Sequence, residues 1–212
     1  HSMMKRAQEK GLLTIRVHQL RKWAVNDYGQ IDDYQYGGGA GMVMMCGPVF
    51  DAAESIARDC DPPPSMVMLT PQGERLTQSL VKALSTERHL LLLCGHYEGF
   101  DERIREGLPL REVSIGDYVL SGGEVPALAV VDAVSRLVPG VVGDEQSVEA
   151  DSFTRGLLDY PHYTRPAEFE GRPVPEVLLS GHHAEIRRWR RETALQRTQP
   201  GLRSTARPIQ QA

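Results

Sequence analysis

The stretch SIGDYVLSGGEVP, residues 114–126, decides how the middle of this 212-residue chain folds. It contains three glycines, two carboxylates and a short apolar run at residues 118–120. The run is too short for a helix and too apolar for a surface loop, so it predicts the end of a buried strand. A tight turn at Gly122 and Gly123 follows, where the backbone can approach a ligand closely because no Cβ intervenes.

A helix is predicted directly after this turn, over residues 125–138. Pro126 stands near its start, where proline is tolerated because the first amides of a helix have no partner within it. The unit is therefore strand, glycine turn and helix. The pattern alone leaves two interpretations open: a nucleotide-like ligand held by backbone groups, or an ordinary connection between a strand and a helix.

The preceding region repeats this alternation. Helices are predicted at 50–58, 76–84 and 101–106, and apolar strands at 66–69 and 89–94. Short apolar strands alternating with helices are typical of an α/β fold, in which helices cover both faces of a parallel sheet.

Glycine-containing or proline-containing turns follow three of these predicted strands, at residues 70–73, 95–99 and 115–123. In parallel sheets, ligands bind outside the carboxyl ends of the strands. Because all three turns are expected at that one edge, together they are a stronger indication of a binding site than any one of them.

The N-terminal region is less regular. Residues 1–11 predict the end of a helix, residues 12–20 a strand, and residues 22–47 a loop that contains YGGGAGM at 36–42. This glycine run matches neither the dinucleotide fingerprint nor a P-loop, since no Gly-Lys pair occurs in the chain. It leaves open a flexible lid, a phosphate cradle or a plain flexible loop, and it argues against a Rossmann-type oxidoreductase.

The amino-acid composition limits the class of protein and the compartment in which we expect it. Hydrophobic residues make up 41% of the chain, which is enough for a core, and no apolar run approaches the roughly 20 residues of a membrane helix. No N-terminal signal is visible. The three cysteines are far apart, which argues against disulfides and a zinc site and is consistent with the reducing cytoplasm.

Charge divides the chain. Residues 1–150 carry 14 basic and 21 acidic side chains, whereas residues 151–212 carry ten basic side chains, all arginine, and seven acidic ones. An arginine-rich part on an acidic body suggests a nucleic-acid contact, because the guanidinium fork suits phosphates. A solvated helix face is the alternative.

We expect three regions: a ligand-binding domain at 1–142, an irregular linker at 143–160, and a small, mostly helical domain at 161–212. The last has a predicted helix at 182–197, with Ile186, Trp189 and Thr193 on one side and arginines toward another. Trp189 is interpreted as a core anchor, with base stacking as the alternative.

Six blocks of sequence in this order and spacing resemble the TrmD family, the bacterial tRNA (guanine-N1)-methyltransferases. They are YGGGAGMVM, LTPQGERL, LCGHYEGFDER, SIGDYVLSGGE, DSFTRGLLDYPHYTRP and VPEVLLSGHHAEIRRWR, and the match runs from about residue 6 to residue 198. The resemblance implies transfer of a methyl group from S-adenosylmethionine (AdoMet) to N1 of the guanosine immediately 3′ of the tRNA anticodon.

For the architecture, the resemblance implies a deep trefoil knot at the C-terminal end of the sheet domain. It also implies a homodimer whose active sites are shared between chains, and a C-terminal domain that binds the anticodon stem-loop. The sequence leaves open whether Mg²⁺ takes part. A knot could not have been derived from periodicity, because knotted connections are very rare.

Carried over position by position, the resemblance assigns the three turns to AdoMet. The implied donor-site residues are Thr70, Pro71, Gln72, Gly95, Tyr97, Glu98, Ile115, Gly116, Asp117, Tyr118, Val119, Leu120, Gly122, Gly123 and Pro126. The implied tRNA contacts are Ser152, Arg165, Arg187, Arg188 and Arg191.

Two catalytic residues are implied: Asp151 as the base that removes the proton from guanine N1, and Arg136 as the cation that stabilises charge growing on O6. Without the resemblance, Asp151 is a linker carboxylate. Arg136, four residues after Asp132, is then a partner in a helix-surface ion pair.

The chain departs from the family at Ala40, where proline is usual, and at His96, where arginine is frequent. The family's first strand has no counterpart here, and the tail after Arg197 is unlike the usual ending. Two further hypotheses are therefore a related knotted methyltransferase that acts at another RNA position, and a non-catalytic RNA-binding protein.

Overall fold

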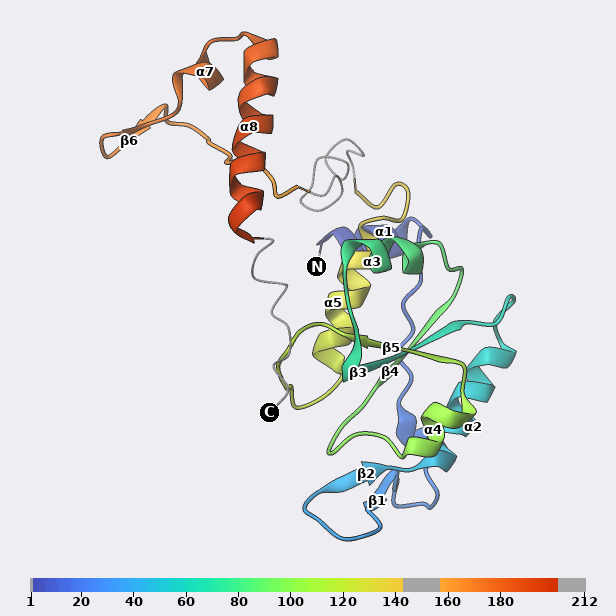
Figure 1. Cartoon of the computed structure of the whole chain (residues 1–212). Coiled ribbons are helices and arrows are strands. Elements are labelled where there is room, and N and C mark those ends of the chain that lie inside the picture. Colours follow the sequence, from blue (N-terminus) through green and yellow to red (C-terminus); the bar gives the residue numbers. More distant parts are fainter. Residues whose placement is uncertain (1, 143–156, 202–212) are drawn as a thin grey trace. The chain divides into compact units, whose positions relative to one another are not determined.

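The computed structural model describes residues 2–142 and 157–201 (Figure 1). The chain divides into two compact units, His1–Gly143 and Asp144–Ala212, and each is described by itself. A helix α1, Ser2–Glu9, opens the first unit as the sequence predicted.

A three-stranded parallel sheet forms the centre of the first unit. The central strand is β3 (Ser65–Arg75), with β4 (Leu90–Cys94) on one side and β5 (Leu110–Ser114) on the other. Both pairings are parallel, with Val67 opposite Leu92 in one and Arg111 in the other. The predicted α/β fold with a parallel sheet is therefore confirmed.

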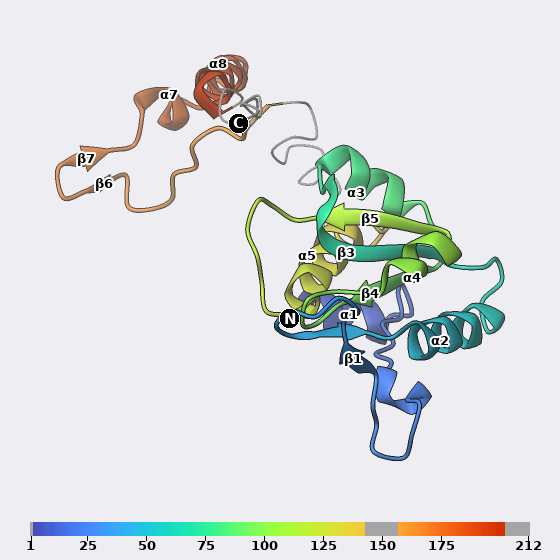
Figure 2. The same cartoon turned by 60° about the horizontal axis from the view of Figure 1, so that its bottom comes forward.

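Helices cover both faces of this sheet because side chains of β3 alternate between them. Met66 and Met68 pack with α2 and α4, while Val67 and Leu69 pack with α3 and α5. Figure 2 shows α3 on one side of the strands and α2 on the other. The helix bounds are Cys46–Arg58 for α2, Gln78–Ser85 for α3, Glu102–Gly107 for α4 and Glu124–Ser135 for α5.

The strand predicted at residues 12–20 is wrong. Residues 13–19 have no regular secondary structure and lead into a short 3₁₀-helix, Leu20–Trp23. Val17 is 93% exposed, so the alternating apolar residues of this segment do not mark a buried sheet face.

The predicted loop at residues 22–47 contains a small antiparallel hairpin, formed by β1 (Asp32–Tyr34) and β2 (Met42–Met44). The glycine run is its tip, where Gly37, Gly38, Gly39 and Gly41 all have positive φ. β2 also bonds to the segment after β4, because the amide of Met44 donates to the carbonyl of Gly99 at 2.9 Å.

Two predictions around the sheet edge need correction. The apolar run at residues 118–120 is not a buried strand end, because Val119 is 84% exposed and the strand β5 ends earlier, at Ser114. The turn predicted at 70–73 is extended chain within β3, with a register shift between Leu69 and Glu74 where it pairs with β5.

The second unit contains a two-stranded hairpin and two helices. They are β6 (Glu168–Phe169), β7 (Arg172–Pro173), α7 (Glu176–Leu179) and α8 (His183–Gly201). The amide of Leu158 donates to Oγ1 of Thr198 at 2.9 Å, so the chain just before the hairpin is held against α8. None of the helices in the described ranges is long and apolar enough to span a membrane.

Candidate functional site

The candidate ligand site lies at the carboxyl-terminal edge of the parallel sheet. Leu69 of β3 pairs with Cys94, the last residue of β4, and with Val113 near the end of β5. The segments that follow these three residues are therefore neighbours at one edge. The sequence predicted that the segments 70–73, 95–99 and 115–123 start from one edge of the sheet. The register of the three strands agrees with this prediction.

The second and third segments are bonded directly to each other. The amide of Gly123 donates to the carbonyl of Gly95 at 2.8 Å, and His96 and Gly122 form an isolated antiparallel bridge. Nε2 of His96 lies 2.5 Å from a carboxylate oxygen of Glu124. The loop after β4 and the turn before α5 thus meet along a short line of contacts.

The contact between these segments explains why residues 122 and 123 are glycines, which the sequence alone did not show. A Cβ on Gly123 would lie 2.5 Å from Cα of Cys94, which is a backbone overlap. A Cβ on Gly122 would lie 2.6 Å from the carboxylate of Glu124 and 2.8 Å from the imidazole of His96. Gly123 is therefore required by the fold itself, whether or not a ligand is bound.

Tyr97 has a backbone conformation that residues other than glycine seldom adopt, with φ of 59°. Such a conformation costs on the order of 1 kcal/mol and tends to occur at functional sites. The side chain of Tyr97 is 52% exposed, and those of Tyr118 and Val119 in the facing segment are also exposed. Apolar surface is therefore open on both of these segments.

The first segment, which follows Leu69, is held in place by contacts with β5, Arg105 and Asp117. A Cβ on Gly73 would overlap the backbone of Val113, so this part of β3 lies tightly against β5. The side-chain oxygen of Gln72 accepts a hydrogen bond from Arg105 at 2.7 Å. At the end of the strand, Arg75 forms an ion pair with Asp117 at 3.0 Å, which connects the first segment to the third.

Arg136 lies at the other end of the same helix. It caps the C-terminus of α5, and the candidate donor segments meet the N-terminus. A helix of 12 residues rises about 18 Å, which separates the backbone of Arg136 from the turn at Gly122 and Gly123. Asp151 and Ser152 lie outside the described residues.

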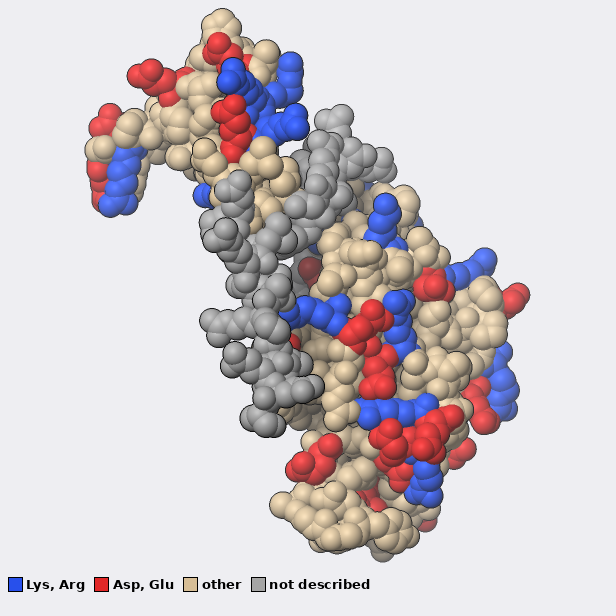
Figure 3. Space-filling model, in the orientation of Figure 1, with Lys and Arg blue, Asp and Glu red and all other residues tan. Residues whose placement is uncertain are grey.

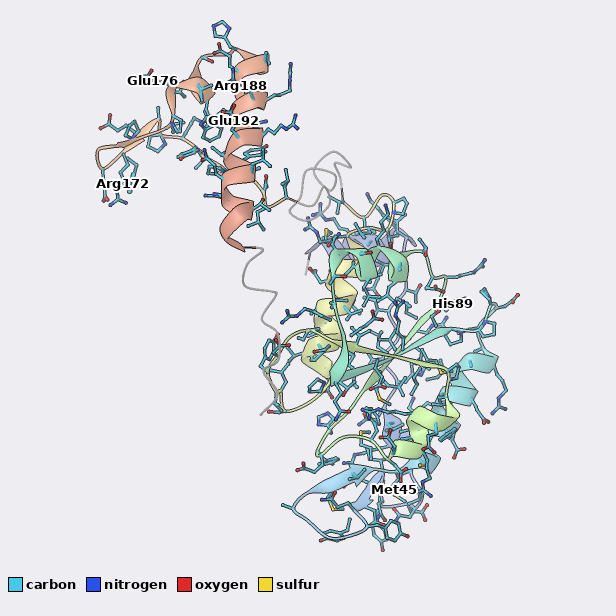
Figure 4. All side chains as sticks on the ribbon, viewed as in Figure 1. Met45, His89, Arg172, Glu176, Arg188 and Glu192 are labelled. Carbon is cyan, nitrogen blue, oxygen red and sulfur yellow. The ribbon has the colours of Figure 1, made fainter. Side chains whose placement is uncertain are left out.

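The second unit carries the predicted tRNA contacts on its surface. Arg165, Arg187, Arg188 and Arg191 are all exposed, and Figure 3 shows arginine side chains gathered along α8 with acidic ones beside them. Nε of Arg188 donates to Glu192 at 2.9 Å, a pair labelled in Figure 4, and this contact raises the pKa of Arg188. Arg188 thus already has a partner on its own helix.

Ile186, Trp189 and Thr193 are half-buried on α8, and the ring of Trp189 lies 6.4 Å from that of Tyr163. This agrees with the interpretation of Trp189 as a packing residue. Tyr163, Ile186 and Arg190 are among the residues that line a hollow of about 430 Å³ in this unit. The guanidinium of Arg190 stacks on the ring of Tyr160, another lining residue, at 4.7 Å. The sequence pattern gave no reason to separate Arg190 from the other arginines of the helix.

His96 and Glu124 are further residues of the site that the sequence did not indicate. They stand 28 positions apart, and only the fold brings them together. Within residues 2–142 and 157–201, no group of three or more His, Cys, Asp or Glu side chains is placed to hold a metal ion.

The chain consists of an α/β unit with a parallel three-stranded sheet and a second unit whose long helix is rich in arginine. The family model described as "tRNA (Guanine-1)-methyltransferase TrmD" matches residues 1–204. Curated proteins named tRNA (guanine-N(1)-)-methyltransferase are similar along 197 residues, which is 93% of this chain. The identity is 53% with the protein of Anoxybacillus flavithermus, 52% with that of Halalkalibacterium halodurans and 51% with that of Bacillus subtilis. The similar region makes up 80% of the length of the first two proteins and 81% of the third. The chain therefore belongs to the TrmD family.

Cys94 gives a prediction about the electrostatics of the site. Burial, and secondarily the negative charge of Glu124, raise the pKa of its thiol to about 11. The thiol therefore stays protonated at neutral pH and is not a nucleophile there. We expect the rate of alkylation of Cys94 by iodoacetamide, followed by peptide mass spectrometry, to rise about tenfold per pH unit from pH 7 to 10.

The control is the same chain in denaturant, where the thiol should titrate near its ordinary value of about 8.5. A native-state alkylation rate that reaches its plateau near that same pH would show that neither burial nor Glu124 raises the pKa of Cys94.

Proposed function

We propose that this protein uses AdoMet to methylate N1 of the guanosine immediately 3′ of the tRNA anticodon. The observation that carries the proposal is membership of the TrmD family over almost the whole chain, at about 50% identity to curated methyltransferases. The three segments at the sheet edge would form the donor site for that activity in this chain.

The residues at the sheet edge fit AdoMet chemically. The exposed rings of Tyr97 and Tyr118 offer apolar faces of the kind that an adenine contacts. The ligand carries a sulfonium and an ammonium, and the same segments carry the carboxylates of Glu98 and Asp117. When bound, AdoMet would supply a methyl group activated by the positive sulfur. This proposal keeps the assigned donor residues: Thr70, Pro71, Gln72, Gly95, Tyr97, Glu98, Ile115, Gly116, Asp117, Tyr118, Val119, Leu120, Gly122, Gly123 and Pro126.

The chain's own chemistry concerns the acceptor. Guanine N1 carries a proton and is a poor nucleophile until that proton leaves. The Asp151 carboxylate accepts it, and the guanidinium of Arg136 stabilises the negative charge that grows on O6. Both roles are carried over from the family and rest on its motif positions.

A second copy of the chain would complete the site. The helix α5 separates Arg136 from the turn at Gly122 and Gly123 by about 18 Å, which supports a shared site in which Arg136 comes from another chain. α5 also exposes an apolar stripe, Val125, Leu128 and Ala129, on the side away from the sheet. Val125 and Leu128 are 58% and 69% exposed, which suits coverage by a second copy. We therefore propose a homodimer with shared active sites.

The remaining family features are proposed on the same basis. The trefoil knot is proposed from membership of the TrmD family. The unit after the linker would hold the anticodon stem-loop by phosphate contacts. We propose a cytoplasmic enzyme because its substrate would be tRNA. A contribution from Mg²⁺ is left to measurement with and without a chelator.

Replacing the proposed base tests the function directly. We expect wild-type protein to methylate an unmodified tRNA that carries guanosine 3′ of the anticodon, with 1-methylguanosine identified by mass spectrometry. Asp151→Ala should lower the single-turnover rate by about 10²-fold or more, the usual effect of removing a general base, while AdoMet affinity stays within about twofold.

A near-native rate for Asp151→Ala would exclude it as the base. Methylation at another position would favour a related knotted enzyme, and wild-type binding of tRNA without AdoMet binding would favour a non-catalytic RNA-binding protein.

The arginine face of α8 gives a second prediction. Arg187 and Arg191 lie one helical turn apart on the exposed surface. Each change to alanine should weaken tRNA binding and reduce the slope of log K against log salt by about 0.7–0.9, as expected for one lost phosphate contact. Fluorescence anisotropy at several salt concentrations measures both quantities.

Arg172→Ala on the β6–β7 hairpin is the matched control, because it removes an equally exposed arginine from the same unit (Figure 4). If all three variants change the salt slope equally, α8 is not a specific phosphate contact. If neither α8 variant changes it, the exposed arginines of that helix form only a solvated face.

A further inference from the structure

His96 and Glu124 connect two walls of the candidate donor site through their side chains. Their contact of 2.5 Å lies beside the backbone bridge between His96 and Gly122. The imidazole is 46% exposed and the carboxylate 61% exposed, so neither side chain is needed to fill the core. Their arrangement therefore calls for an explanation other than packing.

His96 also contacts a third part of the fold. Its amide donates to the sulfur of Met44 in β2 at 3.3 Å. Two residues on, the amide of Glu98 donates to the carbonyl of Met42 at 3.0 Å. The loop after β4 is thus fixed by its backbone on the hairpin side. On the other side, the side chain of His96 reaches the turn before α5.

The exposed segment before α5 is held at its start by the ion pair between Arg75 and Asp117 and at its end by contacts with the loop after β4. Residues 117–121 are all exposed, and one backbone hydrogen bond, from Gly123 to Gly95, ties the end of this segment to the loop after β4. Glu124 is the first residue of α5, so a side chain that holds it also fixes where the exposed segment ends.

We propose that His96 is a positioning residue that, with Glu124, forms a latch holding the loop after β4 and the turn before α5 in the arrangement that binds the methyl donor. The proposal rests on the proposed function, because it assumes that these two segments are walls of the AdoMet site. Neither residue is among the positions that the family resemblance assigned to the donor.

Charge accounts for the strength of the latch. The hydrogen bond from His96 is the main cause that lowers the pKa of Glu124, so the carboxylate is ionised at neutral pH. The pair is more than one-third exposed, and water screens such pairs strongly. Loss of the latch should therefore weaken donor binding by a few-fold, about three- to tenfold, without unfolding the protein.

The test is calorimetric titration of the full chain with AdoMet, using four variants. We expect His96→Ala and Glu124→Gln each to raise the Kd for AdoMet about three- to tenfold. The double variant should be no worse than either single one, because both remove the same interaction. His96→Arg should keep the affinity within about twofold, since a guanidinium can donate to the same carboxylate.

His89→Ala is the matched control. His89 is a half-buried histidine on the far side of β4, and its ring contacts the carbonyl of Asp61 at 3.3 Å (Figure 4). It should leave the Kd unchanged. In steady-state methylation, His96→Ala should raise KM for AdoMet, with kcat at saturating donor within about twofold of wild type.

The outcomes separate the latch from the function itself. If wild-type protein does not bind AdoMet, the proposed function fails. If wild type binds but His96→Ala binds equally well, or if the two single variants add fully in the double variant, the latch is wrong. Thermal unfolding of each variant is followed in parallel, and a loss of affinity that His96→Arg does not restore would also contradict the proposal.

Discussion

The close approach of two backbone segments at the sheet edge is the constraint on which the rest of the first unit depends. The turn before α5 passes so near the end of β4 that only glycine fits at residue 123, and its amide bonds to Gly95. This contact fixes where α5 begins. It also determines how the apolar segment after β5 is presented, and so forms two walls of the candidate donor site.

The helix α5 begins at this contact. One side of the helix is buried against the sheet, and the other is exposed. Val130 is completely buried and packs under the sheet with Val67 and Leu69. Leu128, two residues earlier, is 69% exposed. A helix that is apolar all round is normally covered on all sides, so the outer stripe is consistent with an interface. The distance along α5 from the donor segments to Arg136 supports the same arrangement.

Much of the first unit could be predicted because its buried strands are marked by short apolar runs. The run at 89–94 became β4, and the alternation of Met66, Val67, Met68 and Leu69 became the two-faced central strand. Periodicity failed where apolar residues are not buried within one chain. Residues 118–120 look like a strand but lie exposed, as expected for side chains that serve a ligand or a partner.

The site was predictable to the extent that it follows from topology. Parallel strands place their carboxyl ends at the same edge of a sheet, so the sequence alone predicts that the three segments are neighbours. The contact of His96 with Glu124 could not be predicted, since 28 residues separate them and neither has a distinctive pattern. The strand expected at 12–20 failed for a related reason: alternation does not show whether a partner strand is present.

The central claim is that residues 70–75, 95–99 and 115–124 form one donor site. Hydrogen–deuterium exchange of the full chain with and without AdoMet tests it most directly. The three-walled site predicts that amides in all three segments become protected together, over the same range of AdoMet concentration, while α8 is unchanged. Protection confined to a single segment, or found instead in α8 or the hairpin tip at 36–41, would contradict it.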